Sequence, residues 1–345
     1  MSLLQSTASP DVAAILNKAA SKALNGGTAG ASAAAVQVVT LMWLRTALNY
    51  QYRYGTSTRE ALSTLYAEGG VARLYQGLPF ALVQGPLSRF GDTAANALLA
   101  SLFDSLDPAS AVYPLPLRTA AGSLAAGLWR VLLSPVDTAK TVMQVDGGKA
   151  LPLLWERVQT QGPGVLFSGA LASSAATFVG HFPWFLTYNY LSVQLPPVQQ
   201  FVAENAPLLH GMGVGGEEAQ AAQLLLVLDL LRSACIGLCA SSLSDVCSNS
   251  LRVLKTSRQA AVSVGEGGGG GKDGEGSSGG NSYVELARGI IAQDGWAGLL
   301  GRGLQTRLLS NALQGMLFSV LLKLFQQQSG PGGPGETGGS GGRRG

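Results

Sequence analysis

The chain has 345 residues, of which 46% are hydrophobic and only 12% are charged. This charged share is about half of that in an average globular protein, so the chain is either one polytopic membrane protein or two soluble domains. Its net charge of +3 is weak, and its basic residues are scattered through apolar segments. A nucleic-acid-binding protein gathers such residues on one face, so that class is excluded.

Long apolar segments alternate with short amphipathic segments along the chain. Six of them reach the roughly 20 residues that cross a bilayer and predict spanning helices over residues 28–50, 77–103, 122–144, 169–191, 224–258 and 304–325. Three shorter segments follow the odd-numbered spans and predict amphipathic helices over Thr58–Glu68, Leu151–Gln161 and Tyr283–Gln293. Thr58 is the expected N-cap of the first, and Gly69-Gly70 its end.

The remaining segments bury too little apolar surface to fold. We expect a leader at 1–24, either disordered or a weak targeting helix, loops at 108–117 and 196–222, a Gly-rich disordered insertion at 265–281 and a disordered tail at 328–345.

The chain contains a threefold internal repeat. With Thr40, Pro135 and Ser250 in register, the shared positions are Gly27, Gly122 and Gly237; the bases Arg45, Lys140 and Lys255; and the amides Asn49, Gln144 and Gln259. Each copy continues to a glycine motif at Leu74–Leu78, Leu166–Ala170 or Leu300–Leu304. The predicted repeats are 25–107, 118–195 and 223–327.

The segment Pro135–Lys140, PVDTAK, resembles the signature of the mitochondrial carrier family, in which an acid and a base follow a proline at fixed spacing. The resemblance covers about residues 25–327; the second copy fits best, and the other two depart at the proline and acid positions. It implies an all-α membrane protein with six transmembrane helices in three αα-hairpin repeats, pseudo-threefold symmetry, short matrix-side amphipathic helices and a central cavity. It also implies a monomer in the mitochondrial inner membrane, with the plastid envelope as an alternative.

The resemblance further implies a gate of paired acids and bases on the matrix side. The acid positions are Met42, Asp137 and Arg252, of which only Asp137 is acidic. The expected gate set is therefore Arg45, Asp137, Lys140, Arg252 and Lys255. Like charges repel strongly in a low-dielectric cavity, and one bridge between repeats, Asp137 with Lys255, could form.

Polar side chains within apolar helices are candidates for a substrate site, because they are costly against lipid. From such positions and from the resemblance, the expected set is Gln84, Ser88, Arg89, Asp92, Arg130, Thr177, His181, Asp245, Arg307, Ser310 and Asn311. Structural roles stay open: Arg130 could pair with Asp245, Arg89 could pair with Asp92, and His181 could be a hydrogen-bonded interior histidine. The bases of this set exceed its acids by one, which favours an anionic or zwitterionic metabolite. The resemblance alone disfavours adenine nucleotides, because Ala176-Thr177 stands where they would be bound.

No enzyme, metal or cofactor site is expected. The histidines, His181 and His210, lack a catalytic partner in the sequence, and the cysteines, Cys235, Cys239 and Cys247, lack metal-site spacing. The expected partners are a small-molecule metabolite and the lipid bilayer, with no nucleic acid. The expected function is secondary transport across an organelle inner membrane by alternating access.

Two other classes of protein remain as alternatives. A degenerate carrier fold could serve as a non-transporting membrane scaffold or adaptor, which the loss of two ring acids favours. A soluble helical repeat protein would need a continuous apolar core in place of the mid-helix polar residues.

Overall fold

The structure is a computed structural model that describes residues 27–106, 115–198, 218–264 and 282–328. The expected leader, insertion and tail, most of both expected loops, and His210 lie outside these ranges. Within them the chain forms α-helices and one 3-10 helix, and no strand. The all-α prediction is confirmed for this part of the chain.

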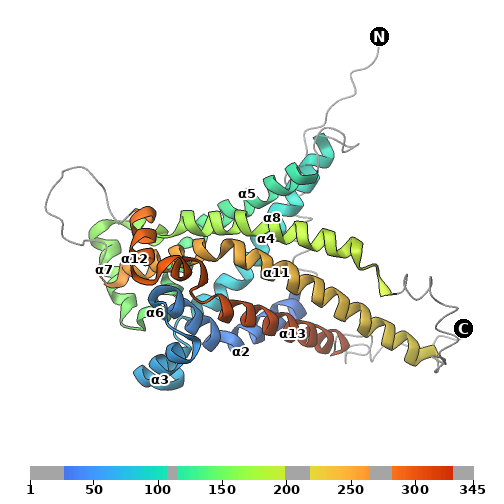
Figure 1. Cartoon of the computed structure of the whole chain (residues 1–345), viewed down its shortest axis with the longest axis horizontal. Coiled ribbons are helices and arrows are strands. Elements are labelled where there is room, and N and C mark those ends of the chain that lie inside the picture. The colour runs from blue at the N-terminus through green and yellow to red at the C-terminus, as the bar shows by residue number, and fades with distance from the viewer. Residues whose placement is uncertain (1–26, 107–114, 199–217, 265–281, 329–345) are drawn as a thin grey trace, which may run out of the picture.

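Seven long helices form an elongated bundle. They are α2 (Gly27–Tyr54), α4 (Leu78–Leu106), α5 (Leu115–Leu132), α6 (Ser134–Asp146), α8 (Ala170–Gln194), α11 (Glu218–Val264) and α13 (Leu304–Gln328). Four further elements connect them: α3 (Thr58–Leu74), α7 (Ala150–Gln161), η1 (Pro163–Phe167) and α12 (Tyr283–Gly301). Figure 1 shows α2, α11 and α13 running along the long axis, with α3, α7 and α12 at one end of it.

Two helix boundaries differ from the predicted ones. One continuous span was predicted over residues 122–144, but α5 ends at Leu132 and α6 begins at Ser134, which places Pro135 in the first turn of α6. Proline fits there because the first turn needs no N–H donor. Helix α11, which contains the fifth predicted span, begins at Glu218, inside the expected loop, because residues 218–222 (EAQAA) consist of good helix formers.

Two of the short helices, α3 and α12, begin with capping boxes. The expected N-cap Thr58 was wrong by one residue: Ser57 Oγ accepts from the backbone N–H of Glu60, and the Glu60 carboxylate accepts from the Ser57 N–H. Ser282 begins α12 with a capping box as well. The predicted stop at Gly69-Gly70 is a kink, after which α3 continues to Leu74.

Three glycines with positive φ place the loops against neighbouring helices. These glycines are Gly77, Gly169 and Gly303, with φ of +83°, +83° and +66°. A Cβ atom at Gly77 would lie 2.9 Å from the Lys140 carbonyl oxygen, and one at Gly169 would lie 3.0 Å from that of Lys255. At Gly303 it would lie 2.9 Å from the Tyr52 ring. A side chain is therefore excluded at all three contacts with α6, α11 and α2.

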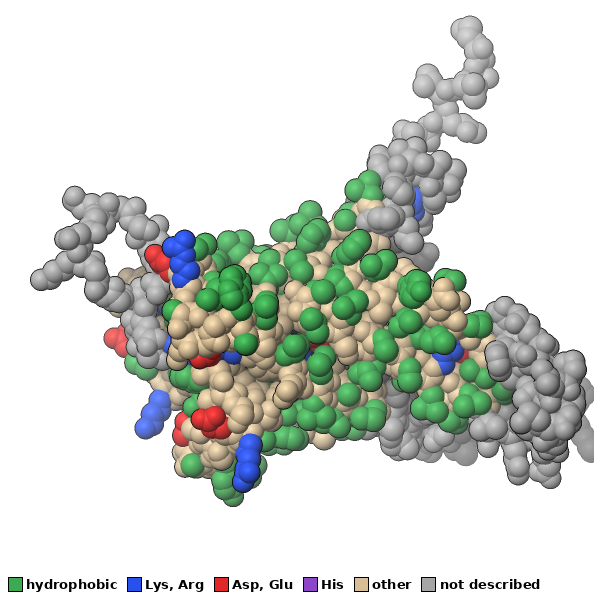
Figure 2. All heavy atoms as spheres, viewed as in Figure 1, with side chains coloured by type: hydrophobic (Ala, Val, Ile, Leu, Met, Phe, Trp, Pro, Cys, Tyr) green, Lys and Arg blue, Asp and Glu red, His purple; other side chains and the backbone are tan. Residues whose placement is uncertain are grey.

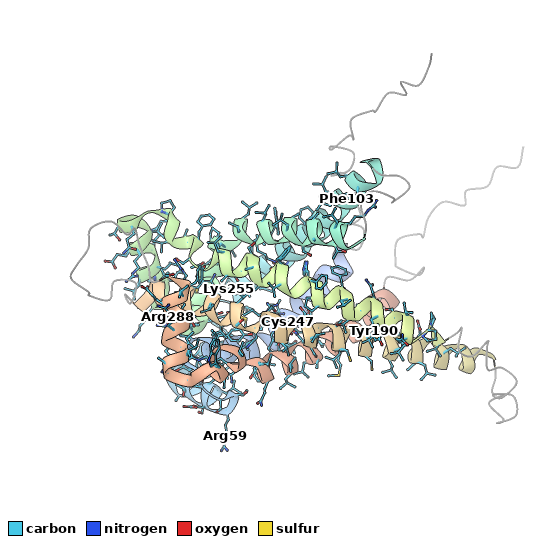
Figure 3. All side chains as sticks on the ribbon, turned by 45° about the horizontal axis from the view of Figure 1, so that its top comes forward. Arg59, Phe103, Tyr190, Cys247, Lys255 and Arg288 are labelled. Carbon is cyan, nitrogen blue, oxygen red and sulfur yellow. The ribbon has the colours of Figure 1, made fainter. Side chains whose placement is uncertain are left out.

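The long body of the bundle carries an apolar surface. Helix α5 exposes Leu124, Leu128 and Leu132, which lie on one face at helical spacing, and Ala126 is fully buried on another. On the face shown in Figure 2, most charged side chains gather at the end where α3, α7 and α12 lie. In Figure 3, Arg59 at this end points away from the bundle, whereas Lys255 lies within it.

Two described segments meet the length and composition of a membrane span: Pro163–Gln194 and Val227–Val262. They overlap the fourth and fifth predicted spans. The other predicted spans do not meet this criterion within the described residues. Glycine, serine and polar side chains such as Gln84 and Arg130 lower the mean hydropathy of these segments.

Candidate functional site

A cavity of about 380 Å³ lies between the long helices. Its lining includes eleven of the sixteen residues predicted for the substrate site and the gate: Arg45, Gln84, Arg130, Asp137, Lys140, Thr177, His181, Arg252, Lys255, Arg307 and Asn311. Ser88, Asp245 and Ser310 are buried behind this lining. The side chains of Arg89 and Asp92, and so their expected local pair, lie outside those that the structure describes.

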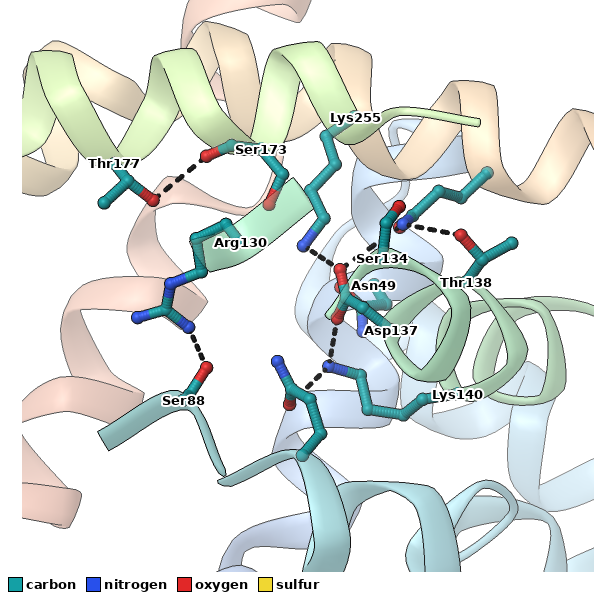
Figure 4. A network of polar contacts seen from close by, with 12 residues as sticks. Asn49, Ser88, Arg130, Ser134, Asp137, Thr138, Lys140, Ser173, Thr177 and Lys255 are labelled. Atoms are coloured by element: carbon teal, nitrogen blue, oxygen red, sulfur yellow. Dashed lines mark hydrogen bonds and ion pairs between the residues drawn. The ribbon is translucent and has the colours of Figure 1, made fainter. Parts of the chain in front are cut away.

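Asp137 is the centre of the first charged cluster (Figure 4). Its Oδ1 lies 2.7 Å from Lys140 Nζ, one turn along α6, and its Oδ2 contacts Lys255 Nζ on α11. Gln259 Nε2 donates to the same Oδ2 over 3.3 Å. The carboxylate is buried, so it depends on these donors in place of water. One acid thus holds two bases from different segments of the chain.

Lys140 joins the predicted gate to the predicted substrate site. Its Nζ donates to Gln84 Oε1 on α4 over 3.1 Å while it pairs with Asp137. The two sets, which the sequence treats as separate, therefore form one polar surface.

Asp245 is the centre of a second charged cluster, built from α11 and α13. Its Oδ1 lies 3.2 Å from Arg307 Nε and 3.6 Å from Arg252 Nη2, and the Asn311 amide donates to its Oδ2. Its side chain is only 4% exposed, whereas those of Arg252 and Arg307 are 27% and 26% exposed. The two guanidinium groups thus stand between this carboxylate and the cavity.

Arg130 lies in a different environment from Asp245. It donates from Nη1 to Ser88 Oγ on α4 (Figure 4), while the ion pairs of Asp245 are with Arg252 and Arg307. The Arg130–Asp245 pair, which the sequence leaves open, is not formed. Both residues occupy the same repeat position, but Ser88 lies on the predicted repeat before that of Arg130, whereas Arg252 and Arg307 lie on the same predicted repeat as Asp245.

The remaining predicted residues have hydrogen-bond partners within the bundle. His181 Nδ1 lies 3.1 Å from Ser123 Oγ, and its ring meets Phe185 edge-on. Thr177 donates to the Ser173 carbonyl over 3.0 Å. Ser310 Oγ accepts from Gln314 Nε2 over 2.8 Å. His181 is therefore an interior histidine with a hydrogen-bonding partner that also lines the cavity.

The amides of the repeats bridge α2 and α6. Asn49 Nδ2 donates to Gln144 Oε1 over 2.5 Å, and Gln144 Nε2 lies 3.7 Å from the Met42 sulfur. Arg45, between Met42 and Asn49 on α2, donates to Gln314 Oε1 on α13 over 2.8 Å. The first repeat thus contributes a base and an amide to the cavity, and a thioether at the acid position.

The electrostatic balance of the cavity is strongly positive. Six basic side chains and one acid stand among the described residues of the lining, and Asp245 lies behind it. This excess of basic over acidic side chains is larger than the single positive charge expected from the sequence, because the bases of the predicted gate line the same cavity. Cations in a low-dielectric cavity are stabilised by an anion.

Several lining residues were missed by sequence reasoning, among them Tyr52, Ser244 and Gln314. Tyr52 follows Arg45 by seven residues, which places both on one helical face, so this spacing could have identified it. Ser244, whose hydroxyl donates to the Gly180 carbonyl, carries no comparable signal.

Asp137 and Lys140 of the first charged cluster lie on a segment that a known family matches. A sequence model described as "Mitochondrial carrier protein" matches residues 112–197, from α5 to the end of α8, including the Pro135–Lys140 signature. The match covers about a quarter of the 345-residue chain, and over this segment the chain is similar to the mitochondrial carrier family. No curated protein sequence matches this chain. Proteins of the family are membrane transporters, which favours the predicted transport class.

Proposed function

We propose that this carrier moves a small anionic metabolite across an organelle inner membrane by alternating access. The observation that carries the proposal is the excess of six basic side chains over one acid in the described cavity lining. Guanidinium groups offer planar pairs of donors that match carboxylate and phosphate oxygens. An anion entering the cavity would replace water around these cations with a charged partner.

The arrangement of Asp245 favours an anion over a zwitterion. A zwitterion needs an accessible carboxylate for its ammonium group, but Asp245 is already held by Arg252, Arg307 and Asn311. Arg130, Arg252 and Arg307 are the proposed anion contacts. Gln84, Thr177 and Asn311 are the neutral contacts that would select among anions.

We propose the six-span, three-repeat architecture with the repeat bounds given above. The support for this architecture is that the loop glycines pack on one another's repeats in a closed cycle. Gly77 of the first repeat packs on α6, Gly169 of the second packs on α11, and Gly303 of the third packs on α2. Each loop glycine therefore lies against the first long helix of the next repeat. A monomer with this closed ring needs no second copy to complete its cavity.

Asp137 would form the matrix gate with Lys140 and Lys255. Its pair with Lys255 joins α6 to α11, so opening the gate requires this contact to break. Since Met42 and Arg252 replace the other two acids, the proposed gate is held by one ionic bridge between repeats. The family places such a protein in the mitochondrial inner membrane; the plastid envelope would suit the same chemistry.

Uptake by the purified protein in proteoliposomes tests the proposal. We expect saturable uptake of anionic metabolites, and we expect Arg130→Ala to lose it. Arg59→Ala should retain uptake, because Arg59 is exposed in the first turn of α3 and points away from the bundle. Absence of uptake for every solute in the panel, with a folded protein, would support the scaffold alternative, which the loss of two ring acids favours.

A further inference from the structure

Tyr52 of α2 carries a buried hydroxyl group without a hydrogen-bond partner. The residue is only 3% exposed, and among the described residues no donor or acceptor meets its hydroxyl oxygen. Leaving a buried hydroxyl unpaired costs free energy. A ligand that binds beside the hydroxyl and accepts its hydrogen would remove this cost.

The ring of Tyr52 is held in place by apolar packing. It lies in a buried cluster with Leu48 and Val253, and a Cβ atom at Gly303 would lie 2.9 Å from the ring. A tyrosine side chain has few rotatable bonds. This packing therefore fixes the position of the hydroxyl group before any ligand binds.

The charged side chains around Tyr52 supply donors and no free acceptor. They are Arg252, Arg307 and Asp245, and the two arginines line the cavity together with Tyr52. A guanidinium group cannot accept a hydrogen bond. Asp245 could accept one, but its oxygens already face both guanidinium groups and the Asn311 amide. The group that is missing beside this hydroxyl is therefore an acceptor.

Arg307 has donors left for such an acceptor. It uses Nε on Asp245 over 3.2 Å, and within the described residues its two Nη groups make no hydrogen bond. Arg252 uses Nε on the Ser248 hydroxyl over 3.2 Å, and its Nη2 lies 3.6 Å from Asp245. One acid and two bases leave this cluster with a single positive charge. A carboxylate matches that charge, whereas a phosphate group carries about −1.5 to −2 at neutral pH.

We propose that Tyr52 is a specificity-determining residue, whose hydroxyl donates a hydrogen bond to a carboxylate group held by Arg252 and Arg307. The inference rests on the proposed anion transport and narrows its substrates to carboxylates. Carboxylate oxygens accept about four hydrogen bonds, so one group can take the paired donors of a guanidinium and the hydroxyl together. A solute without an acceptor at this point leaves the hydroxyl unpaired and binds more weakly.

Thermal unfolding of the purified full-length protein in detergent tests the site, with sodium succinate as the probe. Succinate is titrated against sodium chloride at constant ionic strength, so that general screening is held fixed. We expect succinate to raise the Tm of the wild type saturably. In Tyr52→Phe, the succinate concentration that gives half of this shift should rise about 10- to 100-fold. The Tm of the ligand-free variant should be equal or higher, because the change removes a buried hydroxyl that has no partner.

Tyr54→Phe is the matched control. Tyr54 lies two residues further along α2, is 42% exposed, and donates to Asp146 Oδ1 over 3.2 Å. It lies outside the described lining of the cavity. This variant should bind succinate as the wild type does, and its ligand-free Tm should not rise.

Three results would overturn the site: no succinate shift in the wild type, unchanged succinate affinity in Tyr52→Phe, or a clearly lower Tm for ligand-free Tyr52→Phe, which would reveal a structural partner. Because no transport is measured, the two proposals fail separately. A protein that takes up other anions without binding succinate would contradict this site alone. A protein that binds succinate through Tyr52 but takes up no solute would contradict transport alone.

Discussion

Arg252 and Lys255 lie one turn apart on α11 but pair with different acids. Lys255 contacts Asp137 of α6, whereas Arg252 lies 3.6 Å from Asp245 of its own helix. Helix α11 thus contributes one base to each charged cluster, and each cluster consists of one buried acid and two bases. Both clusters carry an excess positive charge toward the cavity.

Asp137→Asn should destabilise the protein. The change leaves Lys140 and Lys255 side by side without their shared carboxylate, and we expect the free energy of unfolding to fall by about 1–3 kcal/mol. Thermal unfolding measures the loss. Asp229→Asn is the matched control, because its pair with Arg232 spans 3.8 Å and its side chain is 43% exposed, so its effect should be near zero. Equal Tm values for both variants would show that the Asp137 cluster is not stabilising.

Asp245→Asn should also destabilise the fold, because Arg252 and Arg307 would repel each other without it. The double variant Asp245→Asn/Arg252→Gln removes one of the two cations and should recover part of the lost Tm. If the double variant is less stable than the single one, repulsion between the two guanidinium groups is not the cause.

Arg130→Lys separates charge from geometry in the proposed substrate site. Lysine keeps the charge but cannot present two parallel donors to a carboxylate or phosphate. We expect the apparent affinity for the transported anion to fall about 10- to 100-fold, with the protein still folded. Unchanged affinity would show that Arg130 acts only as a point charge.

Gly169→Ala tests the contact between the second loop and α11. A methyl group there meets the Lys255 carbonyl and the Gln259 side chain, at a φ of +83°. Gly162→Ala is the control, since its φ of +88° is similar and no atom lies within 4 Å of the added carbon. Backbone strain should cost both variants about 1 kcal/mol, and Gly169→Ala should lose more. Equal losses in thermal unfolding would contradict the close contact.

The contacts that the sequence predicts well are local ones. The three-residue spacing of Asp137 and Lys140 predicts a shared face of α6, and the two side chains meet there at 2.7 Å. The sequence also locates two irregularities but not their kind: Pro135 lies at a break where one continuous span was predicted, and Gly69-Gly70 form a kink where the end of a helix was predicted.

The partners of Asp245 could not be predicted from the sequence. The repeat position of Asp245 gives the depth of this residue along the bundle. It does not give the rotation of α11 about its axis, and this rotation decides whether Asp245 faces Arg130 or Arg307. The same limit applies to the size of the positive charge in the cavity. Arg45 and Lys140 belong to the gate by motif, and only the packing of α2 against α6 places them in the same space as Arg130.

The central claim is that the positive cavity selects an anion, and matched four-carbon solutes test it most directly. Initial uptake rates into proteoliposomes are compared for a dicarboxylate, the corresponding ω-amino acid and the corresponding diamine, which share a chain length and differ in charge. The account predicts that the dicarboxylate enters fastest and the diamine slowest, and that Arg307→Ala reduces this preference. Faster uptake of the diamine, or equal rates for all three, would contradict it.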